Sequence, residues 1–278
     1  MELWYVQNYL RDFEVGLRVK ETLFVGKSRF QEIAVVDTYL YGKVLLLDGI
    51  VQLSERDEFM YHEMLVHPAM FTHPEPRKVF IVGGGDGGAA REVLKHPVEE
   101  VVLVDIDEEV IEVCQKFFPD LAPWNDPRLR IVIDDATRYI TTSSVFDVII
   151  MDSTDPFPLG VAEPLFSPKF FEEAYHHLTE SGVFVSQMEP PFFEEERVEK
   201  LWSYLGIFPI LRLYWGMVPT YPGGVWSYIL ASKKEDPGVA KRASSFPTRY
   251  YSPKVHQAAF TLPVFLEEMF RRQKKTGS

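Results

Sequence analysis

A glycine-rich turn that carries one acidic residue follows an apolar run near residue 80. The turn reads Gly83-Gly-Gly-Asp86-Gly-Gly88 and has the spacing G-x-G-x-x-G at Gly83, Gly85 and Gly88. Where such a turn joins a strand to a helix in an α/β protein, its backbone approaches the ribose or phosphate of a nucleotide. Asp86 argues against a pyrophosphate, because like charges a few ångströms apart in a cleft repel strongly. The turn therefore favours a cationic ligand.

Two further acids stand at the ends of the next two apolar runs. Asp105 ends the second run, where an acid usually hydrogen-bonds the hydroxyls of a ribose. Asp135 follows the third run, where it is placed to accept a hydrogen bond from an adenine amino group. Together with Asp86, these positions favour an adenosine that has no phosphate and is attached to a positive group. A sulfonium such as S-adenosylmethionine or its decarboxylated form fits this description.

A second acidic group follows the fourth apolar run and reads Asp152-Ser-Thr-Asp155-Pro156. In isolation, this Asp-x-x-Asp-Pro pattern is equally typical of helix capping or of a turn. Its predicted place beside the glycine turn favours a binding role, and the aromatic residues Tyr61 and Tyr221 are candidate walls of the same crevice. Carboxylates and aromatic faces gathered in this way suit a positively charged amine.

These residues require a sheet whose strands all end at one edge. After Pro76, apolar runs alternate with amphipathic helices, which is typical of a parallel sheet covered on both faces. The predicted strands cover 78–82, 101–105, 129–133, 146–151 and 182–187, and the helices cover 88–96, 108–118, 136–141 and 167–178. Runs at 210–215 and 225–231 predict a hairpin that completes the sheet, and a last helix is predicted at 263–272.

The chain before this sheet has a different pattern. Residues 12–53 alternate like strands, at 15–20, 31–36 and 43–47 with a turn at Asp48-Gly49, and a helix is predicted over 57–71. We therefore predict a small antiparallel β domain over 1–56. A doubly wound, Rossmann-like domain of the methyltransferase type is predicted over 57–278.

Composition gives weaker guidance. The 278 residues include 29 basic and 41 acidic ones, a formal net charge of −12, which opposes binding to nucleic acid or anionic membranes. An acidic surface also simply keeps a protein soluble. No apolar run reaches the roughly 18–20 residues of a membrane span, and the first residues lack a signal-peptide pattern. With Cys114 as the one cysteine, no internal disulfide is possible, and we expect a cytoplasmic protein.

His62, Glu63 and His67 superficially suggest a zinc site on a helix. Their spacing is H-E-x-x-x-H. On a helix, positions i and i+5 point about 140° apart, whereas zinc-binding helices use i and i+4. We therefore expect no metal site from these residues.

Several segments together resemble the spermidine synthase (polyamine aminopropyltransferase) family, over roughly residues 4–270. They are LDGIVQ at 47–52, ERDEFMYHE at 55–63, GGGDGG at 83–88, REVLKH at 91–96, DSTDP at 152–156 and PTYP at 219–222. The resemblance implies transfer of the aminopropyl group of decarboxylated S-adenosylmethionine, a co-substrate and not a permanently bound cofactor. The acceptor would be a polyamine, usually putrescine, and the products spermidine and methylthioadenosine. It also implies a homodimer or homotetramer without a metal.

The resemblance further implies roles for individual residues. Gln31, Asp86, Asp105 and Asp135 would hold the donor, with Gln52 beside it and Asp86 on the aminopropyl ammonium. Asp152 would be the base at the attacking amine. The acceptor would be surrounded by Tyr61, His62, Asp155 and Tyr221. The loop at 157–164 resembles the active-site cover of the family, whereas the segment at 187–193 differs among its members.

Three alternatives depend on the same acids. A methyltransferase would have to accommodate the methionine carboxylate near Asp86, which the acidic turn opposes. A protein that binds polyamines without catalysis would not need Asp152, Asp155 and Tyr61 together. An NAD-dependent oxidoreductase is disfavoured because Asp86 would repel the pyrophosphate of its cofactor.

Overall fold

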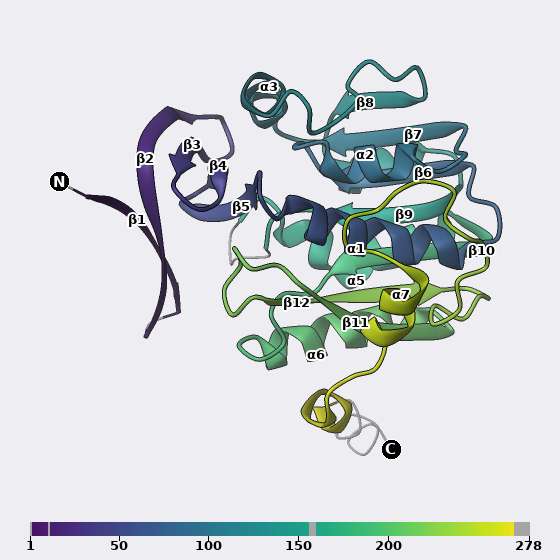
Figure 1. The fold of residues 1–278 in the computed structure, drawn as a ribbon. Coiled ribbons are helices and arrows are strands. Elements are labelled where there is room, and N and C mark those ends of the chain that lie inside the picture. The colour runs from purple at the N-terminus through teal and green to yellow at the C-terminus, as the bar shows by residue number, and fades with distance from the viewer. Residues whose placement is uncertain (1, 11, 156–159, 270–278) are drawn as a thin grey trace.

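The computed structural model describes residues 2–10, 12–155 and 160–269, and it contains two separate sheets (Figure 1). Pro156 of the second acidic group, residues 157–159 of the predicted cover loop and the end of the helix predicted at 263–272 lie outside these residues. Residues 264–269 of that helix are helical. None of the described helices has the length and apolar character that a membrane crossing requires.

The smaller sheet is antiparallel, and its five strands follow one another in chain order. They are β1 (Leu3–Leu10), β2 (Phe13–Lys27), β3 (Glu32–Thr38), β4 (Gly42–Leu47) and β5 (Ile50–Ser54). Asp48 and Gly49 form the tight turn between β4 and β5, both with positive φ (48° and 73°). Strand β1 was not predicted, since our alternating pattern began at residue 12.

The larger sheet has seven strands in the order β11-β12-β10-β9-β6-β7-β8. They are β6 (Lys78–Gly83), β7 (Glu100–Asp105), β8 (Leu129–Ile133), β9 (Phe146–Asp152), β10 (Leu178–Gln187), β11 (Ile210–Met217) and β12 (Val225–Ser232). The pairs among β8, β7, β6, β9 and β10 are parallel, and β12 runs antiparallel to both of its neighbours. The predicted Rossmann-like class is therefore confirmed, with the hairpin at one edge.

Helices cover both faces of this sheet. Successive side chains of a strand point to opposite faces, and here both sets are apolar and must be buried. In β6, Val79 and Ile81 pack into one core cluster with α1 and α2, whereas Phe80 and Val82 pack into another with α5 and α6. The helices are α1 (Glu58–Thr72), α2 (Gly88–Leu94), α3 (Glu108–Phe117), α4 (Ala136–Tyr139), α5 (Pro168–His176), α6 (Glu195–Tyr204) and α7 (Pro253–Ala259). Neither α6 nor α7 was predicted.

Helix α3 packs the smaller sheet against the larger one, and α1 continues the chain from β5 across the larger sheet. Residues of α3, including Val110, Val113 and Cys114, share an apolar cluster with Ile33 and Leu45 of the small sheet. Helix α1 is buried at 14 of its 15 residues, because it packs on the face of the large sheet beside α2 and is covered by the segment at 241–251 (Figure 1). This packing brings the ends of β1 and β5 to the carboxyl edge of the large sheet.

Candidate active site

A cavity opens at the carboxyl edge of the seven-stranded sheet and is lined from both sheets. The chain runs from β6 to β7 on one side and returns later to β9 on the other, so the edge between β6 and β9 is a topological switch point. Ligands of open α/β sheets bind at such crevices. Of the predicted site residues, only His62 is absent from the lining, whose predicted members are Gln31, Gln52, Tyr61, Gly83, Gly85, Asp86, Asp105, Asp135, Asp152, Asp155 and Tyr221.

The glycine turn begins where β6 passes closest to β9. Gly83 has φ +77°, and a Cβ there would lie 2.4 Å from the carbonyl oxygen of Asp152. The N–H of Gly84 donates to that same oxygen at 2.7 Å. Only glycine fits a positive φ together with such a close approach. The turn is thereby tied to the strand that delivers the second acidic group.

At the end of the cavity next to β7, the carboxylates are held by the protein's own donors. Asp105 accepts hydrogen bonds from the backbone N–H of Gly85 and of Asp107, both at 2.9 Å. Burial raises the pKa of Asp105 to about 6 in spite of these bonds. Gln31 reaches this end from the small sheet and donates to Asp107 at 2.8 Å. The side chains are thus oriented before any ligand arrives.

Asp135 and Gln52 stand at the rim of the same end. Asp135 caps α4 and accepts hydrogen bonds from the backbone N–H (2.8 Å) and hydroxyl (2.7 Å) of Thr137. The backbone carbonyl of Gln52 accepts a hydrogen bond from the hydroxyl of Tyr221, which links β5 to the loop before β12. Both residues reach the cavity from loops or strand ends that the sheet fixes.

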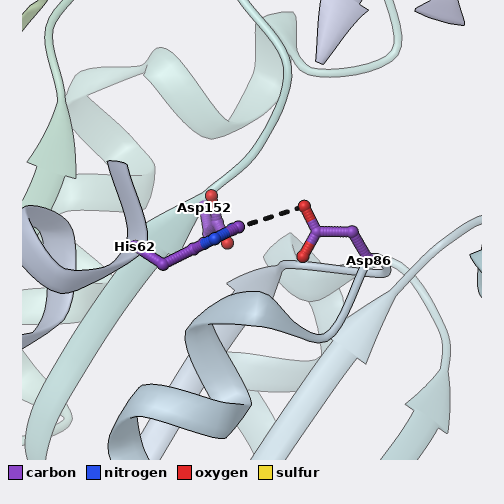
Figure 2. A group of neighbouring side chains, drawn as sticks. All are labelled: His62, Asp86 and Asp152. Atoms are coloured by element: carbon purple, nitrogen blue, oxygen red, sulfur yellow. Dashed lines mark ion pairs between the residues drawn. The ribbon is translucent and has the colours of Figure 1, made fainter. Parts of the chain in front are cut away.

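Asp86 lies between the cavity and a buried histidine (Figure 2). One oxygen accepts the backbone N–H of Gly88 at 2.7 Å, and the other lies 3.4 Å from Nε2 of His62. Burial alone would raise the pKa of Asp86, but the charge of His62 and the bond from Gly88 lower it below its usual range. His62 was predicted to bind the acceptor, yet its side chain is only 1% exposed and lies behind Asp86.

The side chain of Asp152, at the end of β9, has one hydrogen-bond partner among the described residues. Its Oδ1 accepts the hydroxyl of Tyr61 at 2.9 Å, whereas Oδ2 is buried without a hydrogen-bond partner in the described part of the chain. Burial, together with the charge of Asp86, raises the pKa of Asp152 to about 7. A buried carboxylate with a free oxygen and a pKa near neutrality is suited to act as a general base.

A further group of acids continues beyond Asp152. Asp155 accepts a hydrogen bond from Gln187 at 3.0 Å, and burial raises its pKa to about 6. Glu189 follows β10 with a φ of 66° and is fully buried against Arg197, and burial with the charge of Asp155 raises its pKa to about 8. Oε2 of Glu189 makes no hydrogen bond to any described residue. The segment at 187–193, which differs among members of the family, therefore places one more acidic side chain, paired with Arg197, behind this end.

Two lining residues come from β1 and were not predicted. Gln7 is buried and accepts the backbone N–H of Val51 at 3.0 Å, and the hydroxyl of Tyr9 lies 3.5 Å from a carboxylate oxygen of Glu194. Burial and the negative charges around it raise the pKa of Tyr9. Residues 3–10 do not alternate between apolar and polar side chains, so no local pattern in the sequence marks either residue or its proximity to Asp155.

The fold and the cavity together define a class of enzyme. A Rossmann-like sheet with a glycine turn, acids at successive strand ends and a free carboxylate facing an acidic extension is an α/β transferase site. It is suited to a nucleoside-bearing donor and a cationic acceptor.

Comparisons with known proteins identify the family. Residues 58–241 match the family model described as spermine/spermidine synthase domain, and residues 3–55 match the spermidine synthase tetramerisation domain. The polyamine aminopropyltransferase of Clostridium kluyveri is 46% identical over 277 residues, covering 98% of this chain and 100% of the relative. That of Desulforudis audaxviator is 45% identical over 277 residues with the same coverage.

Solved structures agree with these relatives. A spermidine synthase crystallised with the transition-state analogue AdoDATO superposes with a TM-score of 0.92, and the enzyme from Thermotoga maritima with 0.90. Each is 40% identical in sequence and covers 96% of this chain and 94% of its own. The chain belongs to the spermidine synthase family, which confirms the resemblance seen in the sequence. It is a polyamine aminopropyltransferase of the spermidine synthase type, and the family implies decarboxylated S-adenosylmethionine as donor.

Proposed function

We propose that this enzyme transfers the aminopropyl group of decarboxylated S-adenosylmethionine to putrescine, producing spermidine and methylthioadenosine. The observation that carries the proposal is Oδ2 of Asp152, a buried carboxylate oxygen with no hydrogen-bond partner among the described residues, on a side chain that lines a cavity with further acids. Such an oxygen is costly unless a cation or a donor completes it. An ammonium group of the acceptor meets that need.

The donor occupies the end of the cavity next to β7. Asp105 hydrogen-bonds the ribose, Asp135 the adenine amino group, and Gln31 and Gln52 flank the adenosine. Asp86 pairs with the aminopropyl ammonium. Ordinary S-adenosylmethionine carries a carboxylate next to this ammonium, and Asp86 repels it. The support for this assignment is that all these residues line the cavity while their orientation is fixed by the protein's own hydrogen bonds.

The acceptor nitrogen attacks the carbon next to sulfur. A primary amine has a pKa near 10, like that of lysine, and is protonated at neutral pH, so it must first lose a proton. Asp152 takes this proton, the nitrogen–carbon bond forms, and the carbon–sulfur bond breaks with its electron pair passing to sulfur. The leaving thioether is neutral and needs no acid. Tyr61 and Tyr221 hold the amine in line with the bond that breaks.

The acidic extension beyond Asp152 favours an acceptor with a second positive charge. Asp155 and Tyr9 line this end, and Glu189 lies behind them with one oxygen that makes no hydrogen bond to a described residue. A diamine in this cavity brings one nitrogen to Asp152 and leaves the other among these carboxylates. A monoamine offers no second positive charge to Asp155.

We also propose that the smaller sheet, as a domain over residues 1–56, forms the contact between subunits of a homodimer or homotetramer. Six of its large hydrophobic side chains are exposed among the described residues: Leu3 at 55%, Trp4 at 53%, Val6 at 46%, Val25 at 73%, Tyr39 at 59% and Leu40 at 56%. Apolar side chains gathered on one small domain are typical of an interface. The match of residues 3–55 to a tetramerisation domain supports a homo-oligomer. Light scattering of the whole chain would give a tetramer or dimer mass, and a monomer at micromolar concentration would contradict this.

The reaction is tested with a panel of acceptors. The whole chain is incubated with decarboxylated S-adenosylmethionine and, separately, with putrescine, cadaverine, agmatine or spermidine. Products are identified by mass, and released methylthioadenosine is quantified. We expect spermidine from putrescine, at the highest kcat/KM of the panel. A tenfold preference for another amine would overturn the assignment of putrescine, and absence of methylthioadenosine with every amine would overturn the reaction.

A further inference from the structure

A pair of buried histidines lies outside the cavity, where the segment at 241–251 covers α1 (Figure 1). His67 belongs to α1 and His96 follows α2, and both side chains are at most 1% exposed. Nδ1 of His67 and Nε2 of His96 are 3.0 Å apart. Since neither residue lines the cavity, the reaction does not explain why two ionisable rings are buried here.

The segment at 241–251 is attached to α1 at two places. At the carboxyl end of the helix, the guanidinium of Arg242 donates to the backbone carbonyl of Met70 at 2.8 Å. Nearer the start of the helix, the buried carboxylate of Glu63 accepts the backbone N–H groups of residues 249–251, each at 2.8 Å. Glu63, part of the pattern that superficially suggested zinc, instead binds this segment.

Hydrogen-bond partners determine which nitrogen of each ring carries a proton. An arginine side chain can only donate, so Nδ1 of His96, 3.4 Å from the guanidinium of Arg242, must accept. The proton of His96 therefore lies on Nε2 and is donated to Nδ1 of His67. The proton of His67 then lies on Nε2, which is 3.0 Å from a carboxylate oxygen of Glu92. In this arrangement both rings are neutral.

A further proton on His96 has to enter at Nδ1, the atom that accepts from Arg242. An Nδ1–H group cannot accept a hydrogen bond, and it would place an imidazolium beside a guanidinium in a buried site. Burial, together with charges that include that of Arg242, lowers the pKa of His96 to about 2. When the segment is released and His96 meets water, its pKa returns to about 6.5. The released state therefore binds a proton that the attached state excludes, and acid favours release.

The charged and titratable groups around His96 come from four parts of the chain. They are Arg242 from the segment, His67 from α1, Glu92 and Lys95 from α2 and the residue that follows it, and Arg128 from the turn before β8. Glu92 is the one acid among them, and it is already paired with Lys95 at 2.6 Å and with Arg91 at 2.7 Å. These surroundings oppose a charge on His96 as long as the segment is attached.

We propose that His96 and Arg242 make this segment a pH-sensitive clamp on α1, which is closed at neutral pH and opens in mild acid. Opening starts below about pH 6.5, where a released histidine becomes protonated. It frees the three backbone N–H groups that Glu63 accepts. Glu63 follows closely after Tyr61, which donates to Asp152, so opening also loosens the helix that carries this tyrosine.

Hydrogen exchange of the whole chain tests the clamp, followed by mass spectrometry at pH 7.5 and pH 5.5 and corrected for intrinsic rates. The observed amides are those of residues 249–251, which exchange when Glu63 releases them. One excluded proton predicts that their protection falls about tenfold from pH 7.5 to pH 5.5. Amides of β6 are the reference. They should stay at least about a hundredfold more protected at both pH values, because the clamp opens without unfolding of the whole chain.

His96→Asn removes the titration and keeps an acceptor for Arg242, because Oδ1 of asparagine takes a place similar to that of Nδ1 of histidine. We expect the protection of residues 249–251 in this variant to differ by less than about threefold between the two pH values. His176→Asn, which removes an exposed histidine of α5, is the matched control and should keep the fall of the wild type.

Arg242→Met is a second variant in case His96→Asn does not fold. It removes the attachment to Met70 and His96. Protection of residues 249–251 at pH 7.5 should therefore already be at least about tenfold lower than in the wild type. The further fall at pH 5.5 should be smaller than in the wild type, because no guanidinium opposes the proton.

Three results would overturn the proposal. Equal protection of residues 249–251 at both pH values in the wild type would show that the attached segment excludes no proton. A fall in His96→Asn as large as in the wild type would assign the titration to another group. Protection of β6 no higher than that of the segment would mean that the chain opens only as a whole. Exchange is measured without substrate, so these outcomes do not depend on the proposed function.

Discussion

The two ends of the cavity hold carboxylates under different conditions. At the donor end, Asp105 has two backbone N–H partners and Asp135 has two partners on Thr137. At the acceptor end, Asp152 and Glu189 each keep a buried oxygen that makes no hydrogen bond within the described residues. Carboxylates whose oxygens already have partners, such as Asp105 and Asp135, are suited to orient neutral hydroxyl and amino groups, whereas a buried oxygen without a partner is suited to bind a cation and take its proton.

The two ends of the cavity therefore contribute to catalysis in different ways. At the donor end, hydrogen bonds already orient Asp105 and Asp135 without ligand, so these two residues contribute geometry. The carboxyl of Asp152 has a pKa of about 7 because it is buried next to another acid, so it can exchange a proton under ordinary conditions. This separation leads to predictions that act on one end and leave the other unchanged.

The largest effect is expected from Asp152→Asn. The amide keeps the shape and can still accept from Tyr61, but it cannot take a proton from the amine. We expect turnover to fall at least about a hundredfold, while methylthioadenosine binds nearly as in wild type. Steady-state kinetics and calorimetry measure the two quantities. Turnover near that of wild type would exclude Asp152 as the base.

Asp86→Asn should act chiefly on the donor, although loss of its charge also lowers the pKa of Asp152. The variant loses the charge that pairs with the aminopropyl ammonium, so we expect the KM for decarboxylated S-adenosylmethionine to rise roughly tenfold to a hundredfold. The preference for this donor over S-adenosylmethionine should shrink as well. Methylthioadenosine, which has no ammonium, is the control, and its affinity should change little. An equal loss of affinity for methylthioadenosine would show that Asp86 maintains the structure of the glycine turn and does not act by binding the ammonium.

Asp155→Asn tests the opposite end with a smaller expected effect. Asp155 lines the cavity and keeps its carboxylate oriented through Gln187. Loss of its charge should raise the KM for putrescine about tenfold and leave the KM for the donor within about twofold. Initial-rate measurements with each substrate varied in turn separate the two constants. A donor KM that rises as much as the acceptor KM would contradict the division of the cavity.

Much of the donor end could be predicted from the sequence, because it depends on local patterns. Apolar runs followed by Gly83, Asp105, Asp135 and Asp152 place these residues at one edge of any parallel sheet. The strand and helix ranges also agree closely, since period and turn chemistry are local properties. Their roles remain proposals that the variants above test.

The rest depends on contacts between distant segments, which no local pattern reveals. Gln7 and Tyr9 reach the cavity because β1 pairs with β2 and the small sheet packs on α3. His62 resembles a substrate ligand in the sequence because it follows Tyr61. Its actual direction is set by the helix rotation between adjacent residues, which sends Tyr61 to Asp152 and His62 to Asp86.

The smallest effect concerns stability, and it has the opposite sign to the loss of activity. The pKa of Asp152 in the folded protein, about 7, lies above the ordinary value of about 3.9 for the unfolded chain. Between these values the folded state binds the extra proton, so the wild type loses stability as the pH rises through this window. Asn at this position does not ionise and avoids that loss.

We therefore expect Asp152→Asn to gain stability over the wild type as the pH rises from 5.5 to 8.5, by about 1–2 kcal/mol or a few degrees in melting temperature. Thermal unfolding followed by circular dichroism at both pH values measures the gain. Asp120→Asn, at an exposed position, is the control for the change in net charge. A gain that is equal at both pH values, or that the control reproduces, would mean that Asp152 is no more difficult to ionise than a surface acid. The acceptor end would then lack the unsatisfied carboxylate that distinguishes it from the donor end.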